Sequence, residues 1–381
     1  MALNCGIVGL PNVGKSTIFS ALSSAPAEVA NYPFCTINPN IGIVDVPDGR
    51  LARLTELFAP KKTVPATVEF VDIAGLVKGA SRGEGLGNQF LSHIRELGMI
   101  AQVVRCFDDP GVIHVSDRVD PASDMETINI ELALADLETL EKRRERARRA
   151  LKVQAKAEQR EAEQSLAVLE KIAPVLEQGA PVRSLDLDDD ERAAVYDCHF
   201  ITAKPQVYVC NVDEETMRGI AAARATDGTL GGGPHVEAVR GRAALEHSPV
   251  VVICGKFEAE LGAIEDPEEK KAFLGDLGLE EPGLSSLIHA AYGLLGLRTF
   301  FTAGADECRA WTIHAGDTAP RAAGVIHTDF EKGFIKAEVY SYDDIVTYGT
   351  EARIKEAGKY RVEGRDYVVR DGDVMFFKFN V

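Results

Sequence analysis

The sequence predicts an α/β protein built on a largely parallel β-sheet, with a helical insertion and a small mixed domain near its C-terminal end. Helical patterns separate several of the strand-like segments, and this alternation is typical of a sheet with helices packed on its faces. At 381 residues the chain is long enough for two or three domains. The predicted strands are the apolar, β-branched runs at residues 5–8, 41–44, 68–71, 103–107, 207–210 and 250–254.

The insertion lies between the fourth and fifth of these runs. About a hundred residues separate them, where a simple crossover needs only a dozen or more. Residues 125–173 contain no proline or glycine and are rich in helix-forming types, so we expect a helical arm, coiled-coil in character. Its polar middle carries a concentration of basic residues, namely Lys142, Arg143, Arg144, Arg146, Arg148, Arg149, Lys152, Lys156 and Arg160. This is either a solvated hairpin tip or a contact for RNA or an acidic partner.

The last eighty or so residues change character. A helical segment follows Pro282 and Gly283 and leads to Leu297. Beyond it, short strands alternate with glycine turns, and the candidates are residues 310–313, 335–340, 367–369 and 374–379. We expect a separate small domain of mixed structure.

Composition limits the function classes. The net charge of −17 argues against a surface that binds polyanions everywhere, although a local basic patch is compatible with it. No stretch approaches the roughly 18 consecutive apolar residues of a membrane span, and no secretory signal begins the chain. We therefore expect a cytoplasmic protein without a membrane partner.

A phosphate-binding motif follows the first strand. Residues 9–16 read G-L-P-N-V-G-K-S, which satisfies G-x-x-x-x-G-K-[ST], with a helix-compatible segment after it. Backbone N–H groups of residues 12–17 (Asn12, Val13, Gly14, Lys15, Ser16 and Thr17) should cradle phosphate oxygens. Lys15 should reach the β- and γ-phosphates, and the Ser16 hydroxyl should bind Mg²⁺. The sequence thus predicts a P-loop nucleoside triphosphatase.

Two further segments complete this prediction. The strand at residues 68–71 ends in D-I-A-G, so Asp72 should hold the metal through water and the Gly75 amide should sense a γ-phosphate. The glycine-rich residues 75–87 should be a switch that orders with the triphosphate. Between the two motifs, Thr36 is placed to be a second Mg²⁺ ligand.

The base-reading segment departs from the guanine pattern. In N-K-x-D the aspartate accepts two hydrogen bonds from guanine, whereas this chain reads Asn211-Val212-Asp213-Glu214. Glu214 is one methylene longer than aspartate, and Asp213 is out of register by one position. A guanine site should therefore lose a paired buried contact, which weakens guanine preference.

Over essentially its whole length the chain resembles the Obg-like ATPase family, a translation-factor class of P-loop proteins. The shared segments are G-L-P-N-V-G-K-S-T, N-Y-P-F-C-T-I, D-I-A-G-L-V-K-G-A-S, G-L-G-N-Q-F-L, I-H-V-S and the terminal D-G-D-V-M-F-F-K-F-N-V. The resemblance implies a nucleotide-binding domain (1–120 and 204–297), an inserted helical arm (121–203) and a C-terminal TGS domain of β-grasp type (298–381). It also implies a preference for ATP over GTP, with Asn211 and Val212 touching adenine, and binding to the large ribosomal subunit through the arm and the TGS domain.

The hydrolytic step needs a residue outside the usual pattern. Ras-type enzymes orient the attacking water with a glutamine after D-x-x-G, and Leu76 stands there in this chain. Hydrolysis is then either slow or assisted elsewhere, and the resemblance nominates His114 as a catalytic residue beside Lys15. Asn12 is a candidate to help hold K⁺ at the transferred phosphate. The alternatives to an ATPase switch are a GTPase switch and a nucleotide-stabilised adaptor that binds RNA or the ribosome with negligible turnover.

Overall fold

The computed structural model describes residues 4–24, 41–73, 86–113, 118–152, 155–227 and 231–380. These residues form two compact units. The first holds most of the chain up to residue 290, and the second holds residues 43–68 together with those from 291 onward. Three predicted site residues, Thr36, Gly75 and His114, lie outside the described residues, as does Leu76.

The predicted parallel sheet is present. Its strands are β1 (Asn4–Gly9), β2 (Ile41–Asp45), β4 (Thr67–Asp72), β5 (Met99–Arg105), β6 (Gln206–Asn211) and β7 (Val250–Ile253), in the order β2-β4-β1-β5-β6-β7. The pairings β4–β1, β1–β5, β5–β6 and β6–β7 are all parallel. Every residue of β5 and β6 is buried, as expected for parallel strands covered on both faces. The six apolar runs of the sequence therefore did indicate strands.

The helices of the first unit are α1 (Lys15–Ser24), α3 (Leu86–Glu96), α4 (Pro121–Ala150), α5 (Lys156–Glu177), α6 (Asp189–Ala194), α7 (Glu214–Asp227), α8 (Gly233–Ala244), α9 (Gly255–Ala263) and α10 (Pro267–Asp276), with short 3₁₀ turns η1 (Val182–Ser184), η2 (Tyr196–Cys198) and η3 (Ile201–Ala203). Helix α11 (Gly283–Leu294) spans the division between the units. None of the helices in the described ranges is both long and apolar enough to cross a bilayer.

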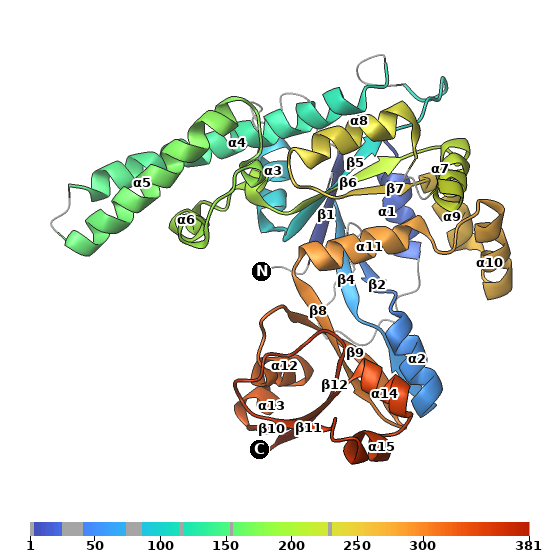
Figure 1. Ribbon diagram of the computed structural model, residues 1–381. Coiled ribbons are helices and arrows are strands. Elements are labelled where there is room, and N and C mark those ends of the chain that lie inside the picture. The colour runs from blue at the N-terminus through green and yellow to red at the C-terminus, as the bar shows by residue number, and fades with distance from the viewer. Residues whose placement is uncertain are drawn as a thin grey trace. The chain divides into compact units, whose positions relative to one another are not determined.

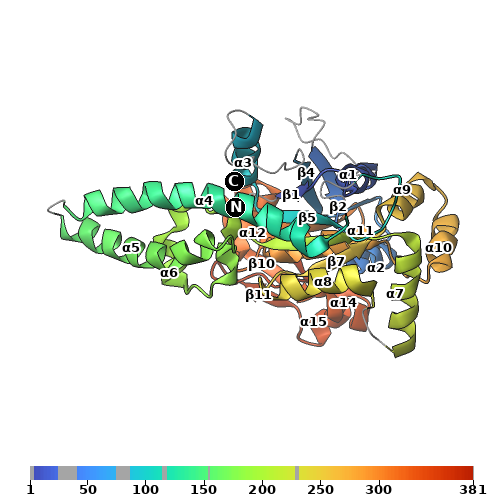
Figure 2. The same cartoon turned by 90° about the horizontal axis from the view of Figure 1, so that it is seen from above.

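Helices α4 and α5 form the predicted arm. They lie side by side as a hairpin in two views (Figures 1 and 2), and they make extensive mutual contacts. Pro121 begins α4, and the Asp120 carboxylate accepts a hydrogen bond from the Ser123 amide, which caps the helix start. Buried apolar side chains fill the space between α4 and the elements packed on it, including Leu140, Val168, Leu169, Ile172 and Leu176.

Acidic residues neutralise part of the basic concentration on the arm. Arg144 pairs with Glu141 at 2.7 Å and with Glu170 at 3.2 Å, and Arg149 pairs with Glu145 at 3.1 Å. Arg144, whose side chain is only 13% exposed, is therefore less available to an external polyanion than the sequence alone suggests.

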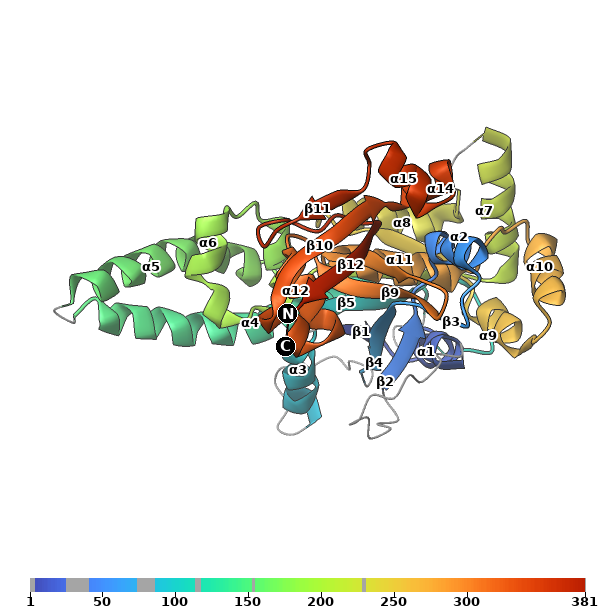
Figure 3. The same ribbon diagram turned by 90° about the horizontal axis from the view of Figure 1, so that it is seen from below.

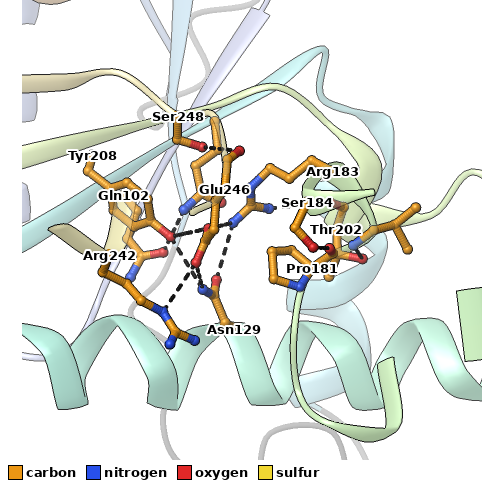
Figure 4. Close-up of polar contacts among 12 residues, drawn as sticks. Gln102, Asn129, Pro181, Arg183, Ser184, Thr202, Tyr208, Arg242, Glu246 and Ser248 are labelled. Carbon is orange, nitrogen blue, oxygen red and sulfur yellow. Dashed lines mark hydrogen bonds and ion pairs between the residues drawn. The ribbon is translucent and has the colours of Figure 1, made fainter. Parts of the chain in front are cut away.

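A buried polar cluster fastens the root of the arm to the sheet (Figure 4). Glu246 is its centre and accepts hydrogen bonds from Arg183 at 2.6 Å, Tyr208 at 2.6 Å and Asn129 at 2.8 Å. Arg183 and Glu246 are 7% and 3% exposed. Burial also raises the pKa of Tyr208 to about 12. Asn129 comes from α4, Tyr208 from β6 and Arg183 from η1, so one carboxylate joins three elements.

The second unit contains a mixed sheet in the order β11-β10-β12-β8-β9-β3 (Figure 3). Its strands are β3 (Lys62–Val64), β8 (Leu297–Ala303), β9 (Glu307–His314), β10 (Phe334–Ser341), β11 (Arg361–Glu363) and β12 (Asp373–Phe379). Its helices are α2 (Gly49–Phe58), α12 (Ala319–Ile326), α13 (Thr328–Lys332), α14 (Tyr342–Tyr348) and α15 (Glu351–Glu356). Helix α12 packs Ala319, Ala322 and Ala323 into a core with Phe300 and Phe377 of the sheet. A helix held against a mixed sheet agrees with the small domain of mixed structure that the sequence predicts.

The structure differs from the sequence prediction at two places in this unit. Residues 367–369 do not form a strand, because Val368 makes only an isolated bridge with Thr318. Residues 43–68, placed by the sequence in the nucleotide-binding domain, cluster with the second unit, since β3 pairs in parallel with β9. Strand β3 has three residues, and its partner lies more than two hundred positions away, so no local pattern reveals the pairing.

Candidate nucleotide-binding site

The P-loop lies between the end of β1 and the start of α1. Gly9 ends β1, Lys15 begins α1, and the backbone between them turns sharply. Asn12 and Gly14 have positive φ angles of 62° and 89°. A Cβ at Gly14 would also collide with the side-chain amide of Asn211, so this position requires glycine for two reasons.

Lys15 is paired with Asp72. Its ammonium contacts Oδ1 of the carboxylate, and the two side chains are 11% and 21% exposed. Asp72 ends β4 and is aligned with Ile7 of β1, so the parallel sheet brings the two motifs to its carboxyl edge. The pair places the predicted phosphate-binding cation beside the predicted metal-binding carboxylate, although 57 residues separate them.

The donor set suits Mg²⁺ more than a softer metal. Ser16, exposed on the first turn of α1, supplies a hydroxyl, and Asp72 supplies carboxylate oxygens. Among the residues that the structure describes, no group of three or more histidine, cysteine, aspartate or glutamate side chains is arranged to hold a metal. A cation here would depend on phosphate oxygens and water for much of its shell, which is how Mg²⁺ is commonly bound with nucleotides.

Asn211 connects the P-loop to another turn at the same edge. Its Nδ2 donates to the carbonyl of Val13 at 2.9 Å, and its Oδ1 accepts from the amide of Gly255 at 2.9 Å. The side chain is 5% exposed. The family resemblance implies that Asn211 touches adenine, and the structure shows its amide hydrogen-bonded to the backbone on both sides. Its visible role is to position the P-loop.

Glu214 and Val212 surround the expected position of the base. Glu214 begins α7, and its carboxylate accepts a hydrogen bond from Lys256 at 3.0 Å. This bond raises the pKa of Lys256. Val212 is buried, and its amide donates to the carbonyl of Ile253 at 2.9 Å. Sequence reasoning missed Lys256, although C-G-K follows the strand at residues 250–253 and so had to reach the same edge.

A cavity of about 630 Å³ opens among these elements. Three parts of the chain line it: the P-loop, the base-reading segment at residues 211–215, and a loop at residues 107–112 that follows β5. Cys254 and Lys256 complete the lining. The loop was also missed by sequence reasoning, because only its neighbour His114 carried a recognisable motif.

Asn12 reaches from the P-loop toward the same loop. Its Nδ2 donates to the carbonyl of Ile113 at 3.1 Å. Ile113 is the last described residue before His114, so the phosphate-binding turn is linked directly to the segment that leads to the proposed catalytic histidine.

Family models match the two ends of the chain. A model described as a 50S ribosome-binding GTPase matches residues 4–137. A model for the C-terminal part of YchF GTPases, described as a protein of unknown function (DUF933), matches residues 297–380.

Relatives match the chain from end to end. Proteins named ribosome-binding ATPase YchF are 54% identical in Escherichia coli O157:H7, 53% in Haemophilus ducreyi and 52% in Bacillus subtilis. Each comparison covers 100% of both chains. A solved structure of the YchF GTPase from Schizosaccharomyces pombe superimposes with a TM-score of 0.85 at 38% identity and covers 98% of this chain and 97% of its own.

Proposed function

This chain belongs to the YchF family, and we propose that it is a Mg²⁺-dependent ATPase that changes conformation with its nucleotide and binds the ribosome. The observation that carries the proposal is the site at the carboxyl edge of the sheet. Lys15 stands beside Asp72 there, and Asn211 ties the P-loop to the cavity wall. Relatives named ribosome-binding ATPase, at 52–54% identity over the full chain, support the activity and the partner.

Nucleotide binding would rearrange the Lys15–Asp72 pair. A triphosphate offers Lys15 a more highly charged partner, and Mg²⁺ competes for Asp72. Ser16 and Asp72 would hold the cation, the latter through water, and Thr36 and the Gly75 amide would complete the site when the triphosphate is present. Lys15 would thus pair with Asp72 in the nucleotide-free protein and with phosphate in the bound protein. Two such alternative ion pairs at one site are what a nucleotide switch needs.

The environment of Glu214 supports the proposed preference for ATP. Guanine recognition needs a carboxylate that can accept two donors, and here Lys256 competes for one oxygen of the longer Glu214 side chain. A GTPase switch is the second candidate, because the matching family model and the solved relative both carry the name GTPase.

His114 and Lys15 are the proposed catalytic residues. Lys15 would stabilise charge on the transferred phosphoryl group, and His114 would orient or deprotonate the attacking water. Asn12 is proposed to help hold K⁺ through its side-chain oxygen, since its nitrogen already donates to Ile113. Equal ATPase rates in K⁺ and Na⁺ buffers would remove the K⁺ role, and an unchanged rate in His114→Ala would remove the histidine.

Ribosome binding is proposed to use the large subunit, the arm and the C-terminal TGS-type domain, with the protein in the cytoplasm. Charge reversal at Arg143, Arg144, Arg148 and Arg149 should reduce co-sedimentation with ribosomes and leave ATP affinity unchanged. Unchanged co-sedimentation would show that the arginines of the arm do not contact the ribosome.

The deciding experiment is calorimetric titration of nucleotide-free protein with Mg-ATP and Mg-GTP. We expect ATP to bind tenfold or more tightly, a difference of about 1.4 kcal/mol. Tighter binding of GTP would make the protein a GTPase switch. Absence of binding by either nucleotide would overturn the proposal, and hydrolysis no faster than in Lys15→Ala would favour the adaptor alternative.

A further inference from the structure

Arg105 is an unusual buried cation beside the nucleotide cavity. It ends β5 in register with Asn211 of β6, and it is only 2% exposed. A buried ion is costly unless it is paired or fully hydrogen-bonded, and the usual partner is a carboxylate. Within the described part of the chain, the hydrogen bonds of Arg105 go to backbone carbonyls instead.

The three carbonyls all belong to one loop. Arg105 donates from Nε to Phe107 at 3.1 Å, from Nη1 to Val112 at 2.9 Å and from Nη2 to Asp109 at 3.1 Å. Its guanidinium also lies 4.6 Å from the centre of the Phe107 ring. The loop therefore folds around a planar, rigid fork of donors, and a lysine could not match this geometry.

Two hydrogen bonds within the loop hold it in one shape without a ligand. The carboxylate of Asp109 accepts from the Gly111 amide at 2.8 Å, and the Asp109 carbonyl accepts from the Val112 amide at 3.1 Å. These two bonds close a turn at the tip. The guanidinium holds both ends of the same turn, at the carbonyls of Asp109 and Val112, so the cation and the turn stabilise one conformation.

The outer side of this loop is a wall of the nucleotide cavity. Phe107, Asp108, Asp109, Pro110 and Val112 line it together with the base-reading segment at residues 211–215. The P-loop lines another part through Asn12, Gly14 and Thr17. Because the P-loop binds phosphates, the 107–112 loop belongs to the part of the cavity left for the base and sugar.

We propose that Arg105 is a positioning residue that preforms the base-and-sugar wall of the nucleotide site. The inference rests on the proposed function, because it requires a nucleoside triphosphate in this cavity. A loop held in its bound shape before the ligand arrives spares the entropy of ordering, so loss of the fork should weaken binding of the nucleoside portion selectively.

The test compares two ligands with Arg105→Lys. Calorimetry with Mg-ATP and with Mg-tripolyphosphate separates contacts to the nucleoside from contacts to the phosphates. We expect the variant to bind ATP at least tenfold more weakly and tripolyphosphate within twofold of the parent. Arg183→Lys is the matched control, since it alters a second buried arginine of the same unit and should leave both affinities unchanged while lowering the melting temperature.

Equal weakening of both ligands, or an unchanged affinity for ATP in folded Arg105→Lys, would overturn the inference. A parent protein that binds tripolyphosphate but not ATP would instead overturn the proposed function. Amide hydrogen exchange on the nucleotide-free parent protein tests the shape of the loop directly, and this test does not require that the variant folds. Protection of the Gly111 and Val112 amides is expected, and exchange at the rate of an open chain would show that the loop is not preformed.

Discussion

Two buried arginines of the first unit are stabilised by different kinds of partner. Arg183, at the root of the arm, pairs with the carboxylate of Glu246 inside a cluster of side chains from several elements (Figure 4). Arg105, at the nucleotide cavity, is held by backbone carbonyls of a single loop. A carboxylate partner fastens elements of the fold to one another, whereas carbonyl partners fix the shape of a loop whose other side stays open to a ligand.

The largest effect that separates the two regions should come from Glu246→Gln. The variant leaves Arg183 buried beside a neutral amide, and breaking such a pair typically costs about 3 to 5 kcal/mol. We expect the free energy of unfolding in urea to fall by about 3 kcal/mol. Arg242, 3.5 Å from Glu246 and 34% exposed, loses the same partner but remains in contact with water. Affinity for Mg-ATP should not change, and a matching loss of affinity would show that the arm root and the cavity act as one region.

Glu258 is a third buried charged group of the first unit, and it should make the stability of the protein depend on pH. It is 3% exposed on α9, two residues beyond Lys256, and it accepts a hydrogen bond from the Gly283 amide at 2.7 Å. Burial raises its pKa from the usual 4.5 to about 7, although the amides of Gly283 and Leu284 oppose the shift. The folded protein thus binds this proton more tightly than the unfolded chain does.

The sign of the effect follows from that difference. The stabilising contribution of the Glu258 proton is complete below pH 4.5 and is lost as the pH rises through about 7. Glu258→Gln lacks this loss, so its stability relative to the parent should increase between pH 5 and pH 8, by at most about 3 kcal/mol. Urea unfolding of both proteins at pH 5 and pH 8 measures this difference in the free energy of unfolding. The same difference at both pH values would contradict the raised pKa of Glu258.

Asn211→Ala should affect the cavity differently from a change at Arg105. It removes the bonds to Val13 and Gly255, so the P-loop loses its brace while the 107–112 loop keeps its own. We expect the binding free energy to weaken by about 1 to 2 kcal/mol. The loss should be the same for tripolyphosphate and for ATP, because the P-loop contacts the phosphates of both ligands. A loss confined to ATP would place Asn211 on the base, as the family resemblance suggested.

The sequence predictions for the site rest on continuous motifs. Residues 9–16 and Asp72 were predicted because each motif follows an apolar run, and the structure shows that parallel strands bring these two motifs to one edge of the sheet. Arg105 and Lys256 were not, because their roles depend on register between strands far apart in sequence. Arg105 is aligned with Asn211, and Asn211 with Ile253, and only these alignments bring the loop and the C-G-K turn to the cavity.

The fold shows the same limit. The six strands of the parallel sheet and the helical arm were predictable from apolar and helical patterns over several residues. Strand β3 was not, since its three residues gain their structure from β9. The arm's basic residues were visible as a composition, but the pairing of Arg144 with Glu170 depends on how α5 packs against α4.

The smallest effect should come from an ion pair on the arm surface, where neither rule for buried arginines applies. Glu145 and Arg149 occupy positions i and i+4, and their charged groups lie 3.1 Å apart. The side chain of Arg149 is 77% exposed and that of Glu145 is 67% exposed. Exposed pairs of this kind contribute about 0.5 kcal/mol or less, because water and salt screen them. Arg149→Ala should therefore leave the urea midpoint nearly unchanged, in contrast to Glu246→Gln. A loss above about 1 kcal/mol would mean that the arm tip depends on its charges for stability, and the ribosome-binding test by charge reversal would then need variants that preserve the pair.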